Sequence, residues 1–137
     1  MKVEISDFKN DNFSRDVNVK ISDQDVWNLD NTLALIIHPS LIKLKADKKG
    51  SPFVFDDDVP EGLKMSESEL DEFHLGNGGQ DKWNGKWTYI LDEMIWTFDQ
   101  IANDKEPLSI DSTYDTWLNR VSNGLMLFGK YYSALWT

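Results

Sequence analysis

Two lysines and two tryptophans interleave within a few residues, as Lys82, Trp83, Lys86 and Trp87. On a helix, this spacing places the two ammonium groups one turn apart and sets a flat aromatic ring beside each of them. Ammonium groups, ring faces and the unpaired amides of a helix N-terminus together suit an anion that carries an attached base. The stretch is therefore a candidate site for a small nucleotide. Two further lysines that could contribute to it are Lys43 and Lys45.

The same residues have a second interpretation. Aromatic residues at helical spacing are more often core residues than ligand contacts, and the lysines beside them are then a solvated flank. The spacing is compatible with both interpretations.

Four acidic residues are candidates for a metal site. Glu69 and Glu72 stand three residues apart, and Asp92 and Glu93 are adjacent. Carboxylate oxygens bind Mg²⁺, so such residues on helices would suit a metal-dependent nucleotide hydrolase. No further acid lies three or four residues from Asp92, however, and acidic helix faces are normally solvated. We therefore assign no metal from the sequence.

Groups that act in catalysis are scarce in this chain. It has two histidines, His38 and His74, and no cysteine, which excludes disulfides and thiol chemistry. The glycine-rich stretch 76–79 follows no predicted strand and precedes no Lys-Ser or Lys-Thr pair, so it does not match a phosphate-binding loop. We expect a protein without enzymatic activity and without a cofactor.

The charge balance narrows the range of partners. The chain has 24 acidic and 14 basic residues, which gives a net charge of −10. Such a surface repels phosphate backbones, which argues against general nucleic-acid binding. The acidic surface either serves solubility or imitates nucleic acid in a basic groove of another protein. No apolar run is long enough to predict a membrane span.

The candidate nucleotide residues lie at the start of a long helix predicted over residues 80–103. Its apolar stripe recurs at spacings of three and four, while Tyr89 and Trp96 fall on the opposite side. The helix is thus either sandwiched in the core or offers its second face to a partner. Because aromatic residues are enriched at interface hot spots, we predict Tyr89 and Trp96 as an interface in a homo-oligomer. The stripe comprises Trp83, Trp87, Ile90, Leu91, Met94, Phe98 and Ile101.

Three further helices are predicted around this one. The first begins after Ser22 and meets Pro39, which forces a kink or a break. A short helix covers residues 67–74, and a last helix begins after Ser112. The apolar stripe of the last helix, which includes Leu118 and Leu125, recurs at spacings of four and three, which is typical of a helix packed lengthwise on another. Two glycines inside it, Gly124 and Gly129, indicate close backbone approach.

The N-terminal residues 1–21 alternate between apolar and polar side chains in two short runs. They predict a β-hairpin or, alternatively, a mobile arm, with a polar loop that includes Asn10, Asp11 and Asn12. The expected fold class is mainly α. It is a small bundle of about four helices over residues 22–137 with a short N-terminal β-hairpin, in a single domain over residues 1–137.

Several separate stretches of the chain share one further pattern. They are residues 25–34, Pro39, Leu44 and Lys45 with Lys48, Gly50 and Pro52, residues 57–61 and residues 87–96. In these stretches the chain resembles small uncharacterised proteins of tailed bacteriophages. The resemblance covers roughly residues 25–104, and the last helix from residue 124 to residue 136 is similar to the C-termini of those proteins. It implies a viral origin and assigns no functional residue.

A phage origin favours binding over turnover, because small accessory phage proteins often block host defences or redirect host enzymes by stoichiometric binding. We therefore expect a non-enzymatic binding protein that acts on a host factor in the host cytoplasm. This expectation is an analogy with such proteins and rests on no particular site. The alternatives are a protein that sequesters a signalling nucleotide and a metal-dependent nucleotide hydrolase.

Overall fold

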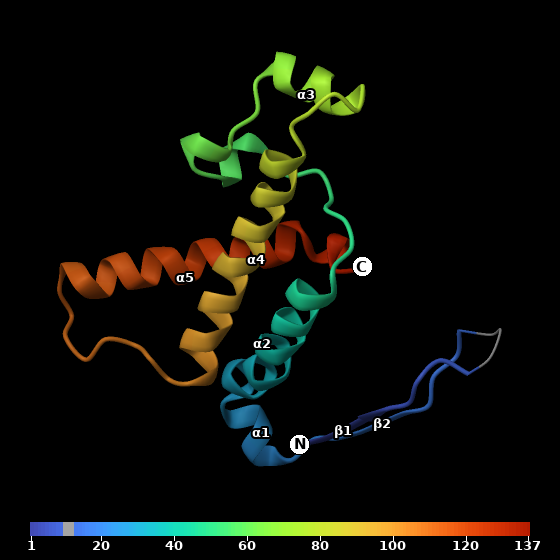
Figure 1. Ribbon diagram of the computed structural model, residues 1–137. Coiled ribbons are helices and arrows are strands. Elements are labelled where there is room, and N and C mark those ends of the chain that lie inside the picture. Colours follow the sequence, from blue (N-terminus) through green and yellow to red (C-terminus); the bar gives the residue numbers. More distant parts are fainter. Residues whose placement is uncertain (10–12) are drawn as a thin grey trace.

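The computed structural model describes residues 1–9 and 13–137, which form a two-stranded hairpin followed by five α-helices (Figure 1). The predicted mainly helical fold with an N-terminal hairpin is confirmed. None of the helices in the described residues is long and apolar enough to cross a membrane. The strands are β1 (Lys2–Ile5) and β2 (Val17–Lys20), and the helices are α1 (Asp23–Trp27), α2 (Leu29–Asp47), α3 (Glu67–His74), α4 (Gln80–Ala102) and α5 (Ser112–Lys130). Short 3₁₀ turns are η2 (Asp56–Asp58), η3 (Glu61–Leu63) and η4 (Tyr132–Ala134).

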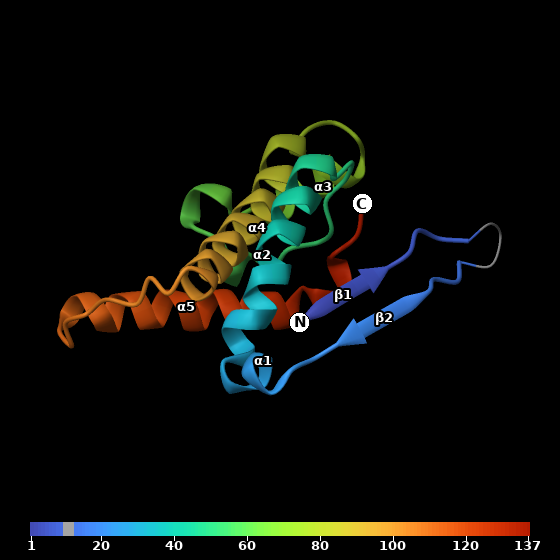
Figure 2. The ribbon, with the colours of Figure 1, turned by 90° about the horizontal axis from the view of Figure 1, so that it is seen from below.

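Helix α4 is the centre of the bundle. Helix α2 packs along it in the opposite direction, and α5 crosses its other side (Figures 1 and 2). The antiparallel pairing is fixed at one end by Asn31, whose side-chain amide donates to the carbonyls of Ile101 and Ala102 at 2.9 and 3.0 Å. These carbonyls belong to the last turn of α4, where intrahelical donors run out. Helix α4 therefore has packing partners within the chain on two of its sides.

The core lies between the three long helices, with α4 in contact with both α2 and α5. Trp87, Ile90, Leu91 and Met94 of α4 have no exposed surface at all. Burial of such side chains contributes roughly 1.5–3 kcal/mol each, so α4 dominates the hydrophobic stabilisation. The residues that pack with them include Ala34, Leu41, Val54, Val59, Phe98, Leu127 and Tyr131.

The prediction that the last helix packs lengthwise on its neighbour is wrong, because α5 crosses α4. A crossing helix buries only a short patch, and Leu118 and Leu125 of the predicted stripe are therefore exposed. At the crossing point, a Cβ added to Gly124 would lie 1.8 Å from Thr97 Oγ1. Gly124 thus permits the close approach, whereas a Cβ on Gly129 would meet nothing within 4 Å. The sequence-based reason given for both glycines holds only for Gly124.

The first predicted helix is divided, though not where proline suggested. Its capping box is present, since Ser22 Oγ accepts from the Asp25 amide and the Asp25 carboxylate accepts from the Ser22 amide. The break comes at Asn28, whose φ of −133° and ψ of 54° lie outside the helical region. Helix α2 then continues through Pro39. The division accounts for five helices where about four were expected.

The hairpin extends away from the helical body (Figure 2). Its register pairs Val3 with Val19 and Ile5 with Val17, so these four side chains share one face. Residues 10–12, which belong to the predicted polar loop, lie outside the described residues. Among the residues that are described, none before Ala34 is buried.

Candidate binding surface

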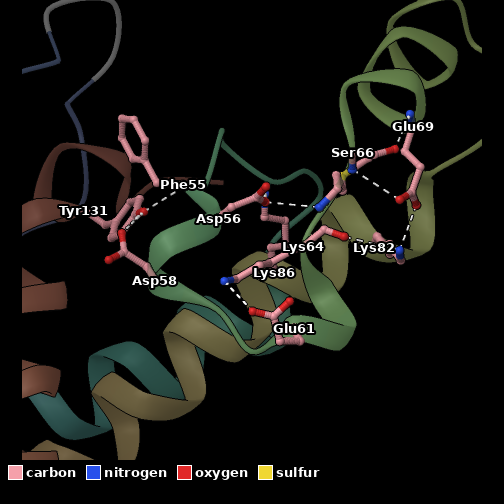
Figure 3. Close-up of polar contacts among 11 residues, drawn as sticks. Phe55, Asp56, Asp58, Glu61, Lys64, Ser66, Glu69, Lys82, Lys86 and Tyr131 are labelled. Atoms are coloured by element: carbon pink, nitrogen blue, oxygen red, sulfur yellow. Dashed lines mark hydrogen bonds and ion pairs between the residues drawn. The ribbon is translucent and has the colours of Figure 1, made fainter.

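The candidate nucleotide residues on α4 hold a segment of their own chain, the docked segment (residues 53–74), which includes η2, η3 and α3. Lys86 is only 2% exposed, and its ammonium lies 2.7 Å from Asp56 Oδ1 (Figure 3). The same oxygen accepts from the Met65 amide at 3.1 Å. The hydrogen bond from Lys86 lowers the pKa of Asp56, and the amide adds to this effect. Lys86 therefore anchors η2 to the first half of α4.

Lys82 holds the other end of the docked segment. Its ammonium lies 2.8 Å from Glu69 Oε2 and 3.3 Å from the Lys64 carbonyl (Figure 3). Glu69 also accepts from the Ser66 amide as part of the capping box that starts α3. The hydrogen bond from Lys82, followed by that from Ser66, lowers the pKa of Glu69. The lysine thus fixes the start of α3 against α4.

Both tryptophans of the candidate site also lie against aromatic rings of the same chain. The ring of Trp83 stacks on Phe73 at 4.3 Å between centroids, and its Nε1 donates to the Ser51 carbonyl at 3.0 Å. Trp87 is fully buried, with Tyr131 6.0 Å away between ring centroids. The lysines and tryptophans proposed to contact an anion and a base therefore contact carboxylates and aromatic rings of the same chain.

Tyr131, at the C-terminal end of α5, closes the opposite side of the docked segment. Its hydroxyl donates to Asp58 Oδ2 at 2.6 Å and accepts from the Phe55 amide at 3.0 Å (Figure 3). Burial and the Asp58 carboxylate both raise the pKa of Tyr131. Lys130 also contacts Asp58, at 2.6 Å, and lies over the ring of Phe55. The sequence analysis missed this contact, because Tyr131 looked like one more apolar residue of the last helix.

The other candidate lysines do not join this site. Lys43 pairs with Asp47 within α2, and Lys45 pairs with Asp92 across the α2–α4 contact. The structure therefore brings together Lys82, Trp83, Lys86 and Trp87 and leaves Lys43 and Lys45 elsewhere.

The carboxylates considered as metal ligands are also dispersed. Glu93 accepts two hydrogen bonds from Arg120, both at 3.0 Å, while Glu69 and Asp92 pair with lysines. Glu72 is exposed on α3. Within residues 1–9 and 13–137, no three metal-binding side chains form a group.

Tyr89 and Trp96, the predicted interface residues, are half-buried within one chain. Tyr89 packs against the core, and burial raises its pKa. The guanidinium of Arg120 lies 3.9 Å from the ring centre of Trp96, which suits a cation–π contact. A shallow hollow beside Trp96 is lined by Thr113, Thr116, Trp117 and Arg120. A role for Tyr89 and Trp96 in a homo-oligomer stays a prediction.

The outer side of the docked segment is strongly acidic. Residues 56–72 hold eight of the 24 acidic residues and a single lysine. Asp56, Asp58 and Glu69 face inward and hold the segment. The exposed carboxylates that make no ion pair in the described part of the chain form what we call the acidic end, namely Asp57, Glu67, Asp71 and Glu72.

Comparisons with family models, curated proteins and solved structures found no match for this chain. The resemblance to phage proteins therefore stays a prediction.

Proposed function

We propose that this chain is a non-enzymatic binding protein, a phage accessory protein that acts on a host factor in the host cytoplasm through its acidic end. The observation that carries the proposal is the segregation of charge on the docked segment. Its inward-facing carboxylates form ion pairs that hold the segment on α4, while its outer carboxylates remain exposed.

The acidic end suits a basic partner. Like charges gathered on one rigid surface raise the rate at which an oppositely charged surface is encountered, and they disfavour acidic competitors. The segment is held in place by hydrogen bonds from Lys86, Lys82 and Tyr131 to its inward-facing carboxylates. The partner is therefore expected to present a cluster of lysine and arginine side chains.

A matched pair of charge reversals tests this proposal. Asp71→Lys with Glu72→Lys alters the acidic end, while Asp30→Lys with Asp115→Lys makes the same change in net charge on α2 and α5. We expect the wild-type protein and the α2/α5 variant to retain the same host protein from lysate at low salt. The acidic-end variant should lose it. Equal retention by both variants, or retention of nothing by the wild type, would overturn the proposal.

Nucleotide sequestration has less support than protein binding. A nucleotide at Lys82 and Lys86 would have to displace Glu69 and Asp56, and Trp87 offers no exposed ring face. Calorimetry with cyclic and linear nucleotides measures this alternative directly, and we expect no heat of binding.

Metal-dependent hydrolysis also has less support, because Asp92, Glu93 and Glu69 are each paired with a cationic side chain. We expect no hydrolysis of nucleoside triphosphates with Mg²⁺ or Mn²⁺.

A further inference from the structure

The N-terminal third of the chain holds most of the exposed large hydrophobic residues. Among the described residues, 15 of the 25 lie within residues 1–42. Exposed apolar side chains gathered in one part of a fold mark an interaction site. We call it the N-terminal apolar surface, and its members on the hairpin, α1 and α2 are Val3, Ile5, Val17, Val19, Ile21, Val26, Trp27, Leu29, Leu33, Leu35 and Ile36.

The hairpin contributes a one-sided apolar ribbon. Val3, Ile5, Val17 and Val19 share one face and are between 39% and 64% exposed. A two-stranded hairpin is marginally stable alone and needs a helix or further strands against its apolar face. In the described part of the chain, the base of the ribbon meets the body at a groove where Val3 lies beside Leu35 and Ile36.

Helix α2 carries the matching surface. It packs on α4 through Ala34, Ile37, Leu41 and Leu44. Leu29, Leu33 and Ile36 recur at spacings of four and three and form a second, exposed stripe about a quarter turn around the helix from that face. Leu35 and Ile42 are exposed on the side opposite to the core face. Exposed apolar residues on more than one side of a helix indicate that a further partner contacts it.

The exposed surface of the whole chain is larger than expected for a folded monomer of its mass. The chain exposes 9297 Å². A folded monomer of 15.8 kDa is expected to expose about 7,300 Å², which leaves an excess of roughly 2,000 Å². A standard interface buries about 800 Å² per partner, and obligate dimers bury about 1,000–2,500 Å² per subunit. The excess is thus of the size that one subunit contributes to an obligate dimer.

The charge distribution allows two copies to meet at this surface. Residues 1–21 hold four basic and four acidic residues, and α2 holds two of each, whereas the whole chain carries −10. The acidic end lies at the α3 end of the bundle, and α1 with the base of the hairpin lies at the other (Figure 1). Contact through the N-terminal apolar surface therefore keeps the two acidic ends apart.

We propose that a second copy of this chain covers the N-terminal apolar surface, in a two-fold dimer in which the hairpin of each subunit lies on α2 of the other. One chain presents both complementary parts, an apolar ribbon and an apolar helix face, which is what a two-fold interface requires. An anionic membrane fits less well, because the ribbon has no basic surplus and the whole chain is strongly acidic. The proposal is independent of the acidic end.

The first experiment measures mass by sedimentation across a range of protein concentrations. We expect a dimer of twice 15.8 kDa for the wild type. Leu33→Glu with Ile36→Glu should raise the dimer dissociation constant on the order of 100-fold or more, because these residues are central to the surface. The matched control is Leu108→Glu with Ile110→Glu, which changes fully exposed residues in the loop between α4 and α5. Circular dichroism establishes that both variants are folded.

A second experiment tests the exchange of hairpins. The chain has no cysteine, so Val17→Cys and Ile36→Cys can be introduced separately into two preparations. After mixing, a short bis-maleimide should join one protein of each kind, and Val17→Cys mixed with Leu108→Cys should give no such product. A wild-type monomer at every concentration, a dimer that survives Leu33→Glu with Ile36→Glu, or equal cross-linking in both mixtures would overturn the proposal. A dimer without a host partner would contradict only the proposed function.

Discussion

At the scale of single residues, the contact between Gly124 and Thr97 decides how closely α5 approaches α4. We expect Gly124→Ala to destabilise the fold by about 1–3 kcal/mol, since the added Cβ overlaps the Thr97 side chain and the helices must separate. Gly129→Ala is the matched control on the same helix. It should be neutral or stabilising by up to about 1 kcal/mol, because alanine favours a helix and nothing lies within 4 Å.

Chemical denaturation of the two variants gives the comparison. Thr97→Ala in the Gly124→Ala background should recover only part of the loss, because Thr97 Cβ would still lie 2.6 Å from the new Cβ. Equal stabilities for Gly124→Ala and Gly129→Ala would show that the helices can separate without cost.

The contact between Lys86 and Asp56 gives a second prediction at this scale. Asp56→Asn leaves the buried ammonium without its carboxylate, and we expect a loss of roughly 2 kcal/mol in the free energy of unfolding. The loss is smaller than for a fully buried pair, because the side chain of Asp56 is 41% exposed. Asp57→Asn removes the same charge from an exposed neighbour and should change stability little. Thermal unfolding of both proteins measures the difference, and similar losses would exclude a special role for Lys86.

These residues also show how far the sequence could be interpreted. The spacing of Lys82, Trp83, Lys86 and Trp87 indicated one cluster, which suited a nucleotide site and a packed core alike. It could not indicate that the anions are Asp56 and Glu69, because that depends on where residues 53–74 fold back. A cluster that binds a ligand and a cluster that binds a segment of its own chain can have the same residue types.

At the scale of elements, the docked segment should respond to acid. Its hydrogen bonds to Lys86 and Lys82 lower the pKa of Asp56 and of Glu69. A carboxyl group whose pKa is lower in the folded state stabilises the fold above its unfolded pKa, and this contribution is lost as the pH falls through the folded pKa. We therefore expect the segment to remain docked at neutral pH and to loosen progressively below about pH 4.

Hydrogen exchange of the Met65 amide reports this change, because that amide donates to Asp56. Its protection should fall progressively below about pH 4 after correction for intrinsic exchange, while the Ile90 amide in the core of α4 stays protected. Protection of Met65 that persists to about pH 2 would show that the carboxylates do not hold the segment.

Secondary structure was predicted well where local signals decide it, and less well where packing does. Ser22 and Ser66 begin helices as their capping boxes indicate. Pro39 causes no break, since α2 continues through it, and the helix is interrupted at Asn28 instead. The crossing of α5 could not be predicted either, because the spacing of Leu118 and Leu125 fits a lengthwise partner equally well. The close approach at the crossing depends on Gly124, where an added Cβ would overlap Thr97.

At the scale of the whole molecule, the two proposed surfaces should respond differently to salt. Exposed charges farther apart than a Debye length are screened, and that length falls from about 10 Å at 0.1 M to about 3 Å at 1 M. Raising the salt concentration should therefore weaken contact between the acidic end and a basic host protein. The dimer should persist, because its surface is apolar and nearly neutral.

Retention of the host protein and sedimentation of this chain, both measured from 0.1 to 1 M salt, provide the comparison. Asp71→Lys with Glu72→Lys serves as the control, since it should retain no host protein at any salt concentration and should leave the dimer unaffected. Dissociation of the dimer with rising salt would mean that charge pairing, rather than the N-terminal apolar surface, joins the subunits.

The acidic end lies at the α3 end of the bundle and the N-terminal apolar surface lies at the other (Figure 1), so the chain is amphiphilic. On a cationic bead it should adsorb with the carboxylates down, leaving the ribbon directed into solution. Adsorption from a dilute solution of single chains would then display the hairpin in one orientation. That arrangement provides an immobilised surface on which the docking of further copies can be followed directly.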